Sequence, residues 1–150
     1  MRVECRCNVS ADRYFSCLAE SVAEDMRQAT GKDVKPSNLK SGMSYVKHMR
    51  TKTGTDSRVR VRIVELEWPY AYAATFSSLQ GVNSIAYRIR EEGEGIAVGY
   101  SEEFEGATRK SRANYQIMKF FYMLGAKRRA RRQLHAIELY AAHHPATIEG

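Results

Sequence analysis

The chain has 150 residues, of which 43% are hydrophobic and 27% charged, and this composition is typical of one globular domain. No apolar run approaches the roughly 20 residues that a membrane helix requires, and the first residues lack the apolar segment of a signal peptide. Residues 1–107 contain 15 basic and 15 acidic residues, whereas residues 108–150 contain nine basic and two acidic ones, so the formal charge of +7 is carried by the C-terminal part. We therefore expect a cytoplasmic protein with an uneven charge distribution.

The first part of the chain is predicted to form a strand followed by a helix. Apolar and polar residues alternate over residues 1–9, which is the pattern of a strand with one buried face. Ser10 is suited to cap the helix and Gly31 to end it. Apolar side chains recur between them at helical spacing: Tyr14, Phe15, Leu18, Val22 and Met26. Residues 32–42 predict a connector that contains a turn or a short helical segment.

From residue 43 the period of the pattern changes from helix to strand. We expect five strands, at 43–51, from 58 to the Trp68-Pro69 interruption, and at 70–78, 82–90 and 96–104. In the second of these, arginines alternate with apolar residues, which predicts one solvated and one buried face. Turns are expected at residues 52–56, at Gly81 and at the glycine-containing segment 91–95.

Residues 109–143 are predicted to form one long helix, which would span roughly 50 Å and extend beyond the sheet, or bend near Gly125. An alternating spacing of three and four keeps one set of residues on the face toward the sheet: Phe120, Met123, Lys127, Ala130, Leu134, Ile137 and Ala141. Ile117, Phe121 and Leu124 form a second apolar face, which continues beyond Gly125 as Arg128, Arg131, Arg132 and His135. We expect one domain over residues 1–144 and a flexible tail at 145–150.

This order of elements predicts an α+β domain, in which about six antiparallel strands are covered by the first and last helices. Three short strings accompany it: QATGK at residues 28–32, GMSYVK at 42–47 and YSEE at 100–103. With the Phe-rich and then basic final helix, they resemble a family of small uncharacterised bacterial proteins, a domain of unknown function in the START-like (SRPBCC) superfamily. The resemblance covers residues 1–143. It implies a helix-grip fold, in which a curved sheet wraps the long C-terminal helix, and a cavity between them that commonly holds apolar ligands.

The chain is rich in aromatic residues, with nine tyrosines, five phenylalanines and one tryptophan. Seven of them fall in or beside the predicted strands: Tyr45, Trp68, Tyr72, Phe76, Tyr87, Tyr100 and Phe104. Together with Ile117 and Phe121 of the long helix, such rings could line a site for an amphipathic small molecule. The alternative is that the same rings fill the core, because side-chain volume alone does not reveal a void.

The long helix also carries five cations within six residues: Lys127, Arg128, Arg129, Arg131 and Arg132. This run is compatible with a solvated helix face, a contact with an anionic membrane surface, or a contact with nucleic acid. The sequence therefore leaves two functional hypotheses. One is a binding module for an apolar small molecule, and the other is an interaction protein that contacts lipid headgroups or nucleic acid through these cations. The oligomeric state stays open.

No motif in the sequence predicts catalysis. Neither His48 nor His135 is accompanied by a nucleophile motif, and there is no HExxH sequence and no glycine-rich phosphate loop. Glu102, Glu103 and Glu105 include one pair that shares a strand face, Glu103 and Glu105, but an acidic strand edge explains all three without chemistry. We therefore expect binding rather than catalysis, and no resident cofactor.

The cysteines and the terminal histidines do not predict a metal site. Cys5 and Cys7 share one face of a strand, but a metal ion would need two or more further ligands nearby, and Cys17 lies in a separate helix. Three cysteines without an export signal indicate reduced thiols. We expect Cys5 and Cys7 to be buried structural thiols. The adjacent pair His143-His144 does not share a helical face and is expected to fray.

Overall fold

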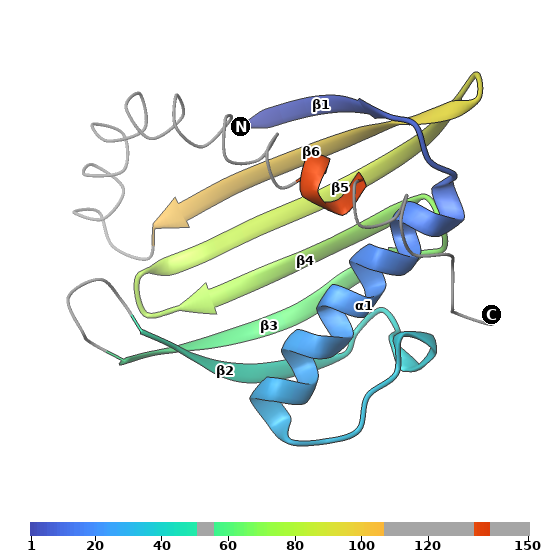
Figure 1. The fold of residues 1–150 in the computed structure, drawn as a ribbon. Coiled ribbons are helices and arrows are strands. Elements are labelled where there is room, and N and C mark those ends of the chain that lie inside the picture. The colour runs from blue at the N-terminus through green and yellow to red at the C-terminus, as the bar shows by residue number, and fades with distance from the viewer. Residues whose placement is uncertain (51–55, 107–133, 139–150) are drawn as a thin grey trace.

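The computed structural model of the chain describes residues 1–50, 56–106 and 134–138. Its centre is a six-stranded antiparallel sheet in the order β1-β6-β5-β4-β3-β2. The strands are β1 (Arg2–Cys7), β2 (Ser44–Arg50), β3 (Asp56–Glu67), β4 (Ala71–Ser78), β5 (Gly81–Glu92) and β6 (Gly95–Gly106). Helix α1 (Ala11–Thr30) follows β1 at one edge of the sheet and crosses one face, here called the inner face, to β2 at the other edge (Figure 1). The short helix η1 (Pro36–Asn38) lies in the connector to β2. The predicted α+β sheet is therefore confirmed.

Helix α1 begins and ends where local chemistry predicts. The Ser10 hydroxyl accepts a hydrogen bond from the Arg13 N–H at 3.2 Å, which satisfies one free donor of the first turn. Gly31 has φ of 70° and donates its N–H to Arg27 at 2.8 Å, which closes the last turn. The apolar stripe, which includes Tyr14 and Phe15, is buried against the sheet.

The predicted strands are present, but three of them are longer than expected. β3 starts at Asp56, within the predicted turn, and β5 and β6 run on to a tight turn of two residues at Gly93 and Glu94. In β3 Val59, Val61 and Ile63 are buried and the arginines are exposed, as the alternation predicts. The pairing of β3 with β4 shifts between Ile63 and Glu65, and Val64 is exposed there. Such a bulge adds one residue to a strand and therefore inverts the alternation beyond it.

The core lies between α1, the inner face and the helical segment at residues 134–138. Its fully buried large side chains are Tyr14, Phe15, Val61, Ile63, Ile96, Val98 and Leu134. Leu134 is buried and Ile137 is half-buried, whereas His135 is exposed, as expected from the predicted helix faces. None of the helices in the described part of the chain combines the length and the apolar character of a membrane span.

Several sequence-based expectations lie outside the described residues. They are the remainder of the long helix at 109–143, the bend at Gly125, the domain end at 144, the tail at 145–150 and the pair His143-His144.

Candidate functional site

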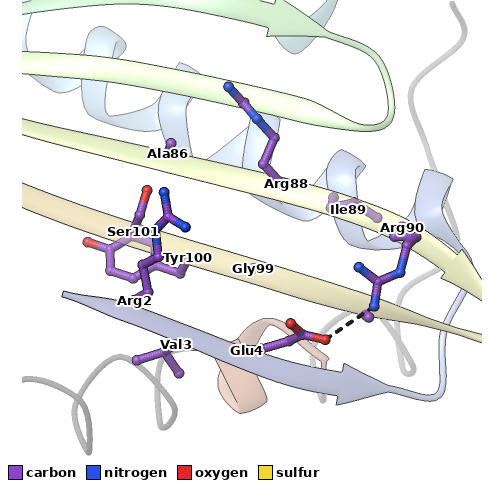
Figure 2. A pocket seen from close by; sticks show the side chains of 11 residues that line it. Arg2, Val3, Glu4, Ala86, Arg88, Ile89, Arg90, Gly99, Tyr100 and Ser101 are labelled. Atoms are coloured by element: carbon purple, nitrogen blue, oxygen red, sulfur yellow. Dashed lines mark hydrogen bonds and ion pairs between the residues drawn. The ribbon is translucent and has the colours of Figure 1, made fainter.

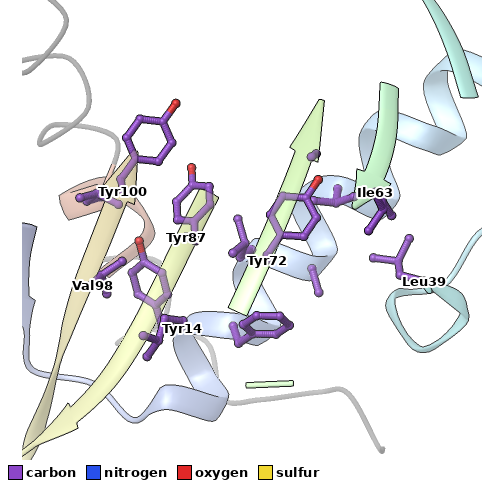
Figure 3. Packing of buried hydrophobic residues seen from close by; sticks show 14 of the residues in the cluster. Tyr14, Leu39, Ile63, Tyr72, Tyr87, Val98 and Tyr100 are labelled. Carbon is purple, nitrogen blue, oxygen red and sulfur yellow. The ribbon is translucent and has the colours of Figure 1, made fainter. Parts of the chain in front are cut away.

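Aromatic side chains form rows across the inner face, because neighbouring strands are paired in register. Tyr72, Tyr87 and Tyr100 lie opposite one another on β4, β5 and β6. Their ring centroids are 6.2 Å apart for Tyr72 and Tyr87, and 5.0 Å for Tyr87 and Tyr100. Figure 3 shows the three rings with their hydroxyl ends pointing the same way. A second row runs from β2 to β6 through Tyr45, Val61, Phe76, Asn83 and Phe104.

Two adjoining hollows lie over these rows. The first has a volume of about 350 Å³ and is lined by Lys47, Val59, Phe76, Ser78, Gly81, Asn83, Ile85, Tyr100, Glu102 and Phe104. The second has a volume of about 380 Å³ and lies between α1 and the sheet, lined by Leu18, Ser21, Val22, Glu24, Asp25, Gln28, Tyr45, Lys47, Tyr72, Phe76, Ile85, Tyr87 and Ile137. Lys47, Phe76 and Ile85 line both, so the two hollows adjoin on the inner face.

The structure brings together six of the seven rings that the sequence singled out, since Tyr45, Tyr72, Phe76, Tyr87, Tyr100 and Phe104 line these hollows. Trp68 lies apart from them, in the turn between β3 and β4. Its ring packs edge-on against Phe15, with centroids 4.7 Å apart, and its indole N–H donates to Asp12 at 3.2 Å. Trp68 therefore joins this turn to α1. The remaining predicted site residues lie outside the described residues: Ile117, Phe121, Lys127, Arg128, Arg129, Arg131 and Arg132.

One polar group of the hollows is organised around Asp25 of α1. Its carboxylate accepts hydrogen bonds from the Lys47 ammonium at 3.1 and 3.2 Å and from the Tyr45 hydroxyl. The same ammonium lies 5.4 Å from the centre of the Phe76 ring, within the range of a cation–π contact. Burial, and secondly the hydrogen bond to Asp25, raise the pKa of Tyr45. Tyr45 is therefore a neutral donor near pH 7 and not a base.

A second polar group is centred on Glu102 of β6. Its Oε1 accepts a hydrogen bond from Nδ2 of Asn83 at 2.8 Å, and its Oε2 accepts one from the Tyr100 hydroxyl at 3.1 Å. Because a carboxylate accepts but does not donate, the Asn83 amide must turn its NH₂ toward Glu102 and its oxygen away. Burial, and secondly the charge of Glu102, raise the pKa of Tyr87 to about 12.

Sequence reasoning assigned Glu102 to an acidic strand edge and missed its inward position, although a signal for that position was present. It singled out Glu103 and Glu105, which share a face, but the structure shows that neither of them lines these hollows. Glu102 instead lies two residues after Tyr100 and two before Phe104, so it shares their face of β6. It lines the first hollow with them. In a strand with one apolar face, the inward positions normally carry apolar side chains. A charged residue at such a position is therefore the signal that singles out Glu102.

Sequence reasoning also missed a contact between the C-terminal helical segment and β1, which joins residues 130 positions apart. His135 Nε2 lies 3.6 Å and its Nδ1 lies 4.0 Å from the Cys5 sulfur, while Glu138 accepts from the Asn8 N–H at 2.7 Å. The His135 Nδ1 is 3.2 Å from Glu138. The sulfur is about equally far from both ring nitrogens, so it is not directed at one lone pair as a nucleophile–base pair requires. This cluster anchors the C-terminal segment to the sheet.

The thiols have the chemistry of core residues. Cys5 and Cys7 are both buried and free. Burial is the main reason that the pKa of Cys7 is raised to about 12, so this thiol stays protonated and is a poor nucleophile and metal ligand near pH 7. Among the described residues, no three His, Cys, Asp or Glu side chains are placed to hold a metal ion. His48 is exposed on β2.

A third hollow, of about 540 Å³, lies on the outer face of the sheet over β1, β5 and β6 (Figure 2). Small residues contribute to its lining: Ala86, Ala97, Gly99 and Ser101. Two of its arginines are paired, Arg88 with Glu65 at 2.9 Å and Arg90 with Glu4 at 3.3 Å. These ion pairs offset the positive charge there, and the hollow lacks the aromatic rows of the inner face.

The family model described as a domain of unknown function, DUF3284, matches residues 1–123. The chain belongs to the DUF3284 family. No curated protein matches the sequence of this chain.

Solved structures share the fold of the DUF3284 chain at low sequence identity. Ara h 8.0201 has a TM-score of 0.61 at 13% identity, over 96% of this chain and 97% of that chain. TTHA0849 from Thermus thermophilus has a TM-score of 0.65 at 9% identity, over 95% and 97%. Mll3558 from Rhizobium loti has a TM-score of 0.58 at 14% identity, over 92% and 94%. These similarities show a shared fold, and at such identities they carry no information on function.

Proposed function

We propose that this DUF3284 protein binds an apolar or amphipathic small molecule on the inner face of its sheet, without catalysis. The observation that carries the proposal is the pair of adjoining hollows, of about 350 and 380 Å³, lined by six aromatic rings and a few polar groups. Small-molecule sites are typically concave, largely apolar, roughly 300–1,000 Å³ in volume and equipped with a few oriented polar groups. The resemblance to START-like proteins supports the same face, since it implies a cavity between sheet and helix.

The chemistry of the lining favours binding over reaction. Tyr45 and Tyr87 have raised pKa values and are therefore neutral donors near pH 7. Lys47 is held by Asp25 in an ion pair of 3.1 Å, which occupies its ammonium group. We further propose a single domain over residues 1–144 that acts in the cytoplasm. The buried free thiols of β1 support that location, because free cysteines are typical of reducing compartments.

A filling substitution tests the proposal. Ile85 lines both hollows, whereas Val82 lies on the same strand with its side chain on the opposite face. The neutral apolar dye N-phenyl-1-naphthylamine should bind the wild-type protein with increased fluorescence. Ile85→Trp should weaken this binding at least about tenfold by filling the space, while Val82→Trp should leave it unchanged. Circular dichroism establishes that both variants are folded. Equal binding by the two variants, or no binding by the wild type, would refute the proposal.

The alternative function uses the five cations at residues 127–132, which lie outside the described residues. The charge asymmetry of the sequence favours it, because the whole net charge lies beyond residue 107. Replacement of the four arginines in that run by Gln should then abolish binding to anionic vesicles or to oligonucleotides. Unchanged binding would exclude this function.

A further inference from the structure

We propose that the ligand carries a cationic, hydrogen-bond-donating head, such as a protonated amine, which Glu102, oriented by Asn83, binds in the first hollow. Its apolar body would lie over Phe76 and Ile85. This inference rests on the proposed function, because it names the chemical class of ligand for the same site. It is carried by two polar groups of the hollow: the Glu102 carboxylate, whose charge no described residue neutralises, and the Asn83 amide, which orients that carboxylate.

The first of these groups is the carboxylate of Glu102, a half-buried side chain. Among the described residues its hydrogen-bond donors are Asn83 and Tyr100, which are both neutral. The α-amino group of Met1 donates to the main-chain oxygen of Glu102, at 2.8 Å, and not to the carboxylate. Within the described residues Glu102 takes part in no ion pair. A charge withdrawn from water is stabilised most effectively by an opposite charge, which a ligand could supply.

The second group is the side-chain oxygen of Asn83. It is buried and has no hydrogen-bond partner in the described part of the chain. Its orientation is fixed, since the NH₂ of the same amide must face the Glu102 carboxylate. This oxygen is closed to a water-sized molecule, so the ligand head contacts Glu102, and Asn83 acts by holding that carboxylate in place.

The charges around the hollow favour a cation over an anion. Lys47 is the basic residue of the lining, and Asp25 already holds its ammonium through both carboxylate oxygens. The negative charge of Glu102 therefore remains, and it would repel a carboxylate or phosphate head. The same lysine lies over the Phe76 ring, which shows that the face of this ring can accept a cation.

The sheet register gives the ligand a direction. Glu102 lies opposite Ile85 on the neighbouring strand, and Asn83 lies opposite Phe104 and Phe76. The polar head group site is thus bordered by apolar side chains that continue toward the second hollow. A molecule with one terminal amine and a short aliphatic or aromatic body matches this surface, which is polar at Glu102 and apolar beyond it.

The test compares three ligands that share one body: octylamine, octanol and octanoate. Each ligand is titrated, at pH 7 and below its micelle concentration, into the wild-type protein with bound N-phenyl-1-naphthylamine. Displacement of the dye then measures the affinity of the ligand. Charge-assisted hydrogen bonds are roughly twice as strong as neutral ones, so we expect octylamine to bind about tenfold more tightly than octanol. Octanoate should bind most weakly. If octanol or octanoate binds as well as octylamine, the cationic head is wrong while the proposed function stands. If the dye itself does not bind, the proposed function fails.

Two matched substitutions assign the effect to Glu102. Glu102→Gln keeps the shape and an acceptor oxygen but removes the charge, and should abolish the advantage of octylamine over octanol. Glu103→Gln removes the neighbouring charge, which is exposed on the other face of β6, and should leave the advantage intact. An advantage that persists in folded Glu102→Gln would overturn the assignment. If that variant does not fold, the wild-type ligand series decides the question.

Discussion

Replacement of Asp25 by Ala removes the carboxylate that organises the polar end of the second hollow. Asp25 holds the Lys47 ammonium at 3.1 and 3.2 Å and accepts the Tyr45 hydroxyl. The side chains of Lys47 and Asp25 are 21% and 37% exposed, so the substitution leaves a partly desolvated ammonium without a counter-charge. A hydrogen bond to a charged group contributes about 1.5–3 kcal/mol, and partial exposure roughly halves the total for two such bonds. We expect the free energy of unfolding to fall by about 1.5–3 kcal/mol.

Urea unfolding followed by circular dichroism measures this loss, and the exposed ion pair of Arg6 with Glu92 supplies a matched control. Its nitrogen and oxygen are 3.2 Å apart, almost the same distance, but its side chains are 72% and 39% exposed. Water screens such a pair, so Arg6→Gln should lower stability by less than about 0.5 kcal/mol. If Asp25→Ala and Arg6→Gln have equal effects, burial does not set the strength of the Asp25 ion pair and the reasoning is refuted.

Three further predictions concern the scaffold. Phe15→Ala, in the buried core, should lower stability by about 3–5 kcal/mol in urea unfolding, whereas Leu79→Ala, at a position 96% exposed, should change it by less than about 0.5 kcal/mol. Gly81→Ala should lower the Tm more than Gly93→Ala, because both have positive φ but only at Gly81 would a Cβ collide with a main-chain oxygen of β6. Burial raises the pKa of Tyr87 from 10.0 to about 12, so the unfolded chain loses this proton first. Thermal unfolding should therefore show stability falling from pH 10 to 12, by about 1.4 kcal/mol per pH unit from this group.

The elements of the fold could be predicted wherever one local interaction decides them. The Ser10 cap and the left-handed Gly31 define the two ends of α1, and both were read correctly. Alternation likewise identified the buried side of β1 and of the first half of β3. These features depend on steric contacts and hydrogen bonds between residues that are close in the sequence. They can therefore be inferred from the spacing of residue types.

The parts that could not be predicted depend on pairing between distant segments. The bulge between Ile63 and Glu65 shifts the register of β3, and nothing in the local pattern requires an extra residue there. Trp68 was grouped with the strand aromatics, but its packing on Phe15 depends on where α1 crosses the sheet. The contact of His135 with Cys5 spans 130 residues. In each case the energy comes from tertiary packing, for which local sequence is a weak guide.

Glu102 shows how the two kinds of information combine. Strand alternation places it between Tyr100 and Phe104 on the inner face, and the register then adds Asn83, which lies 19 residues earlier in the chain. A leucine at this position would pack the apolar face without desolvating a charge, so packing alone does not account for the carboxylate. Asn83 and Tyr100 nevertheless hold it in one orientation, which is the arrangement a binding group needs before its ligand arrives. Departures from local pattern are expected at functional sites, and this one coincides with a hollow and with an unpaired amide oxygen.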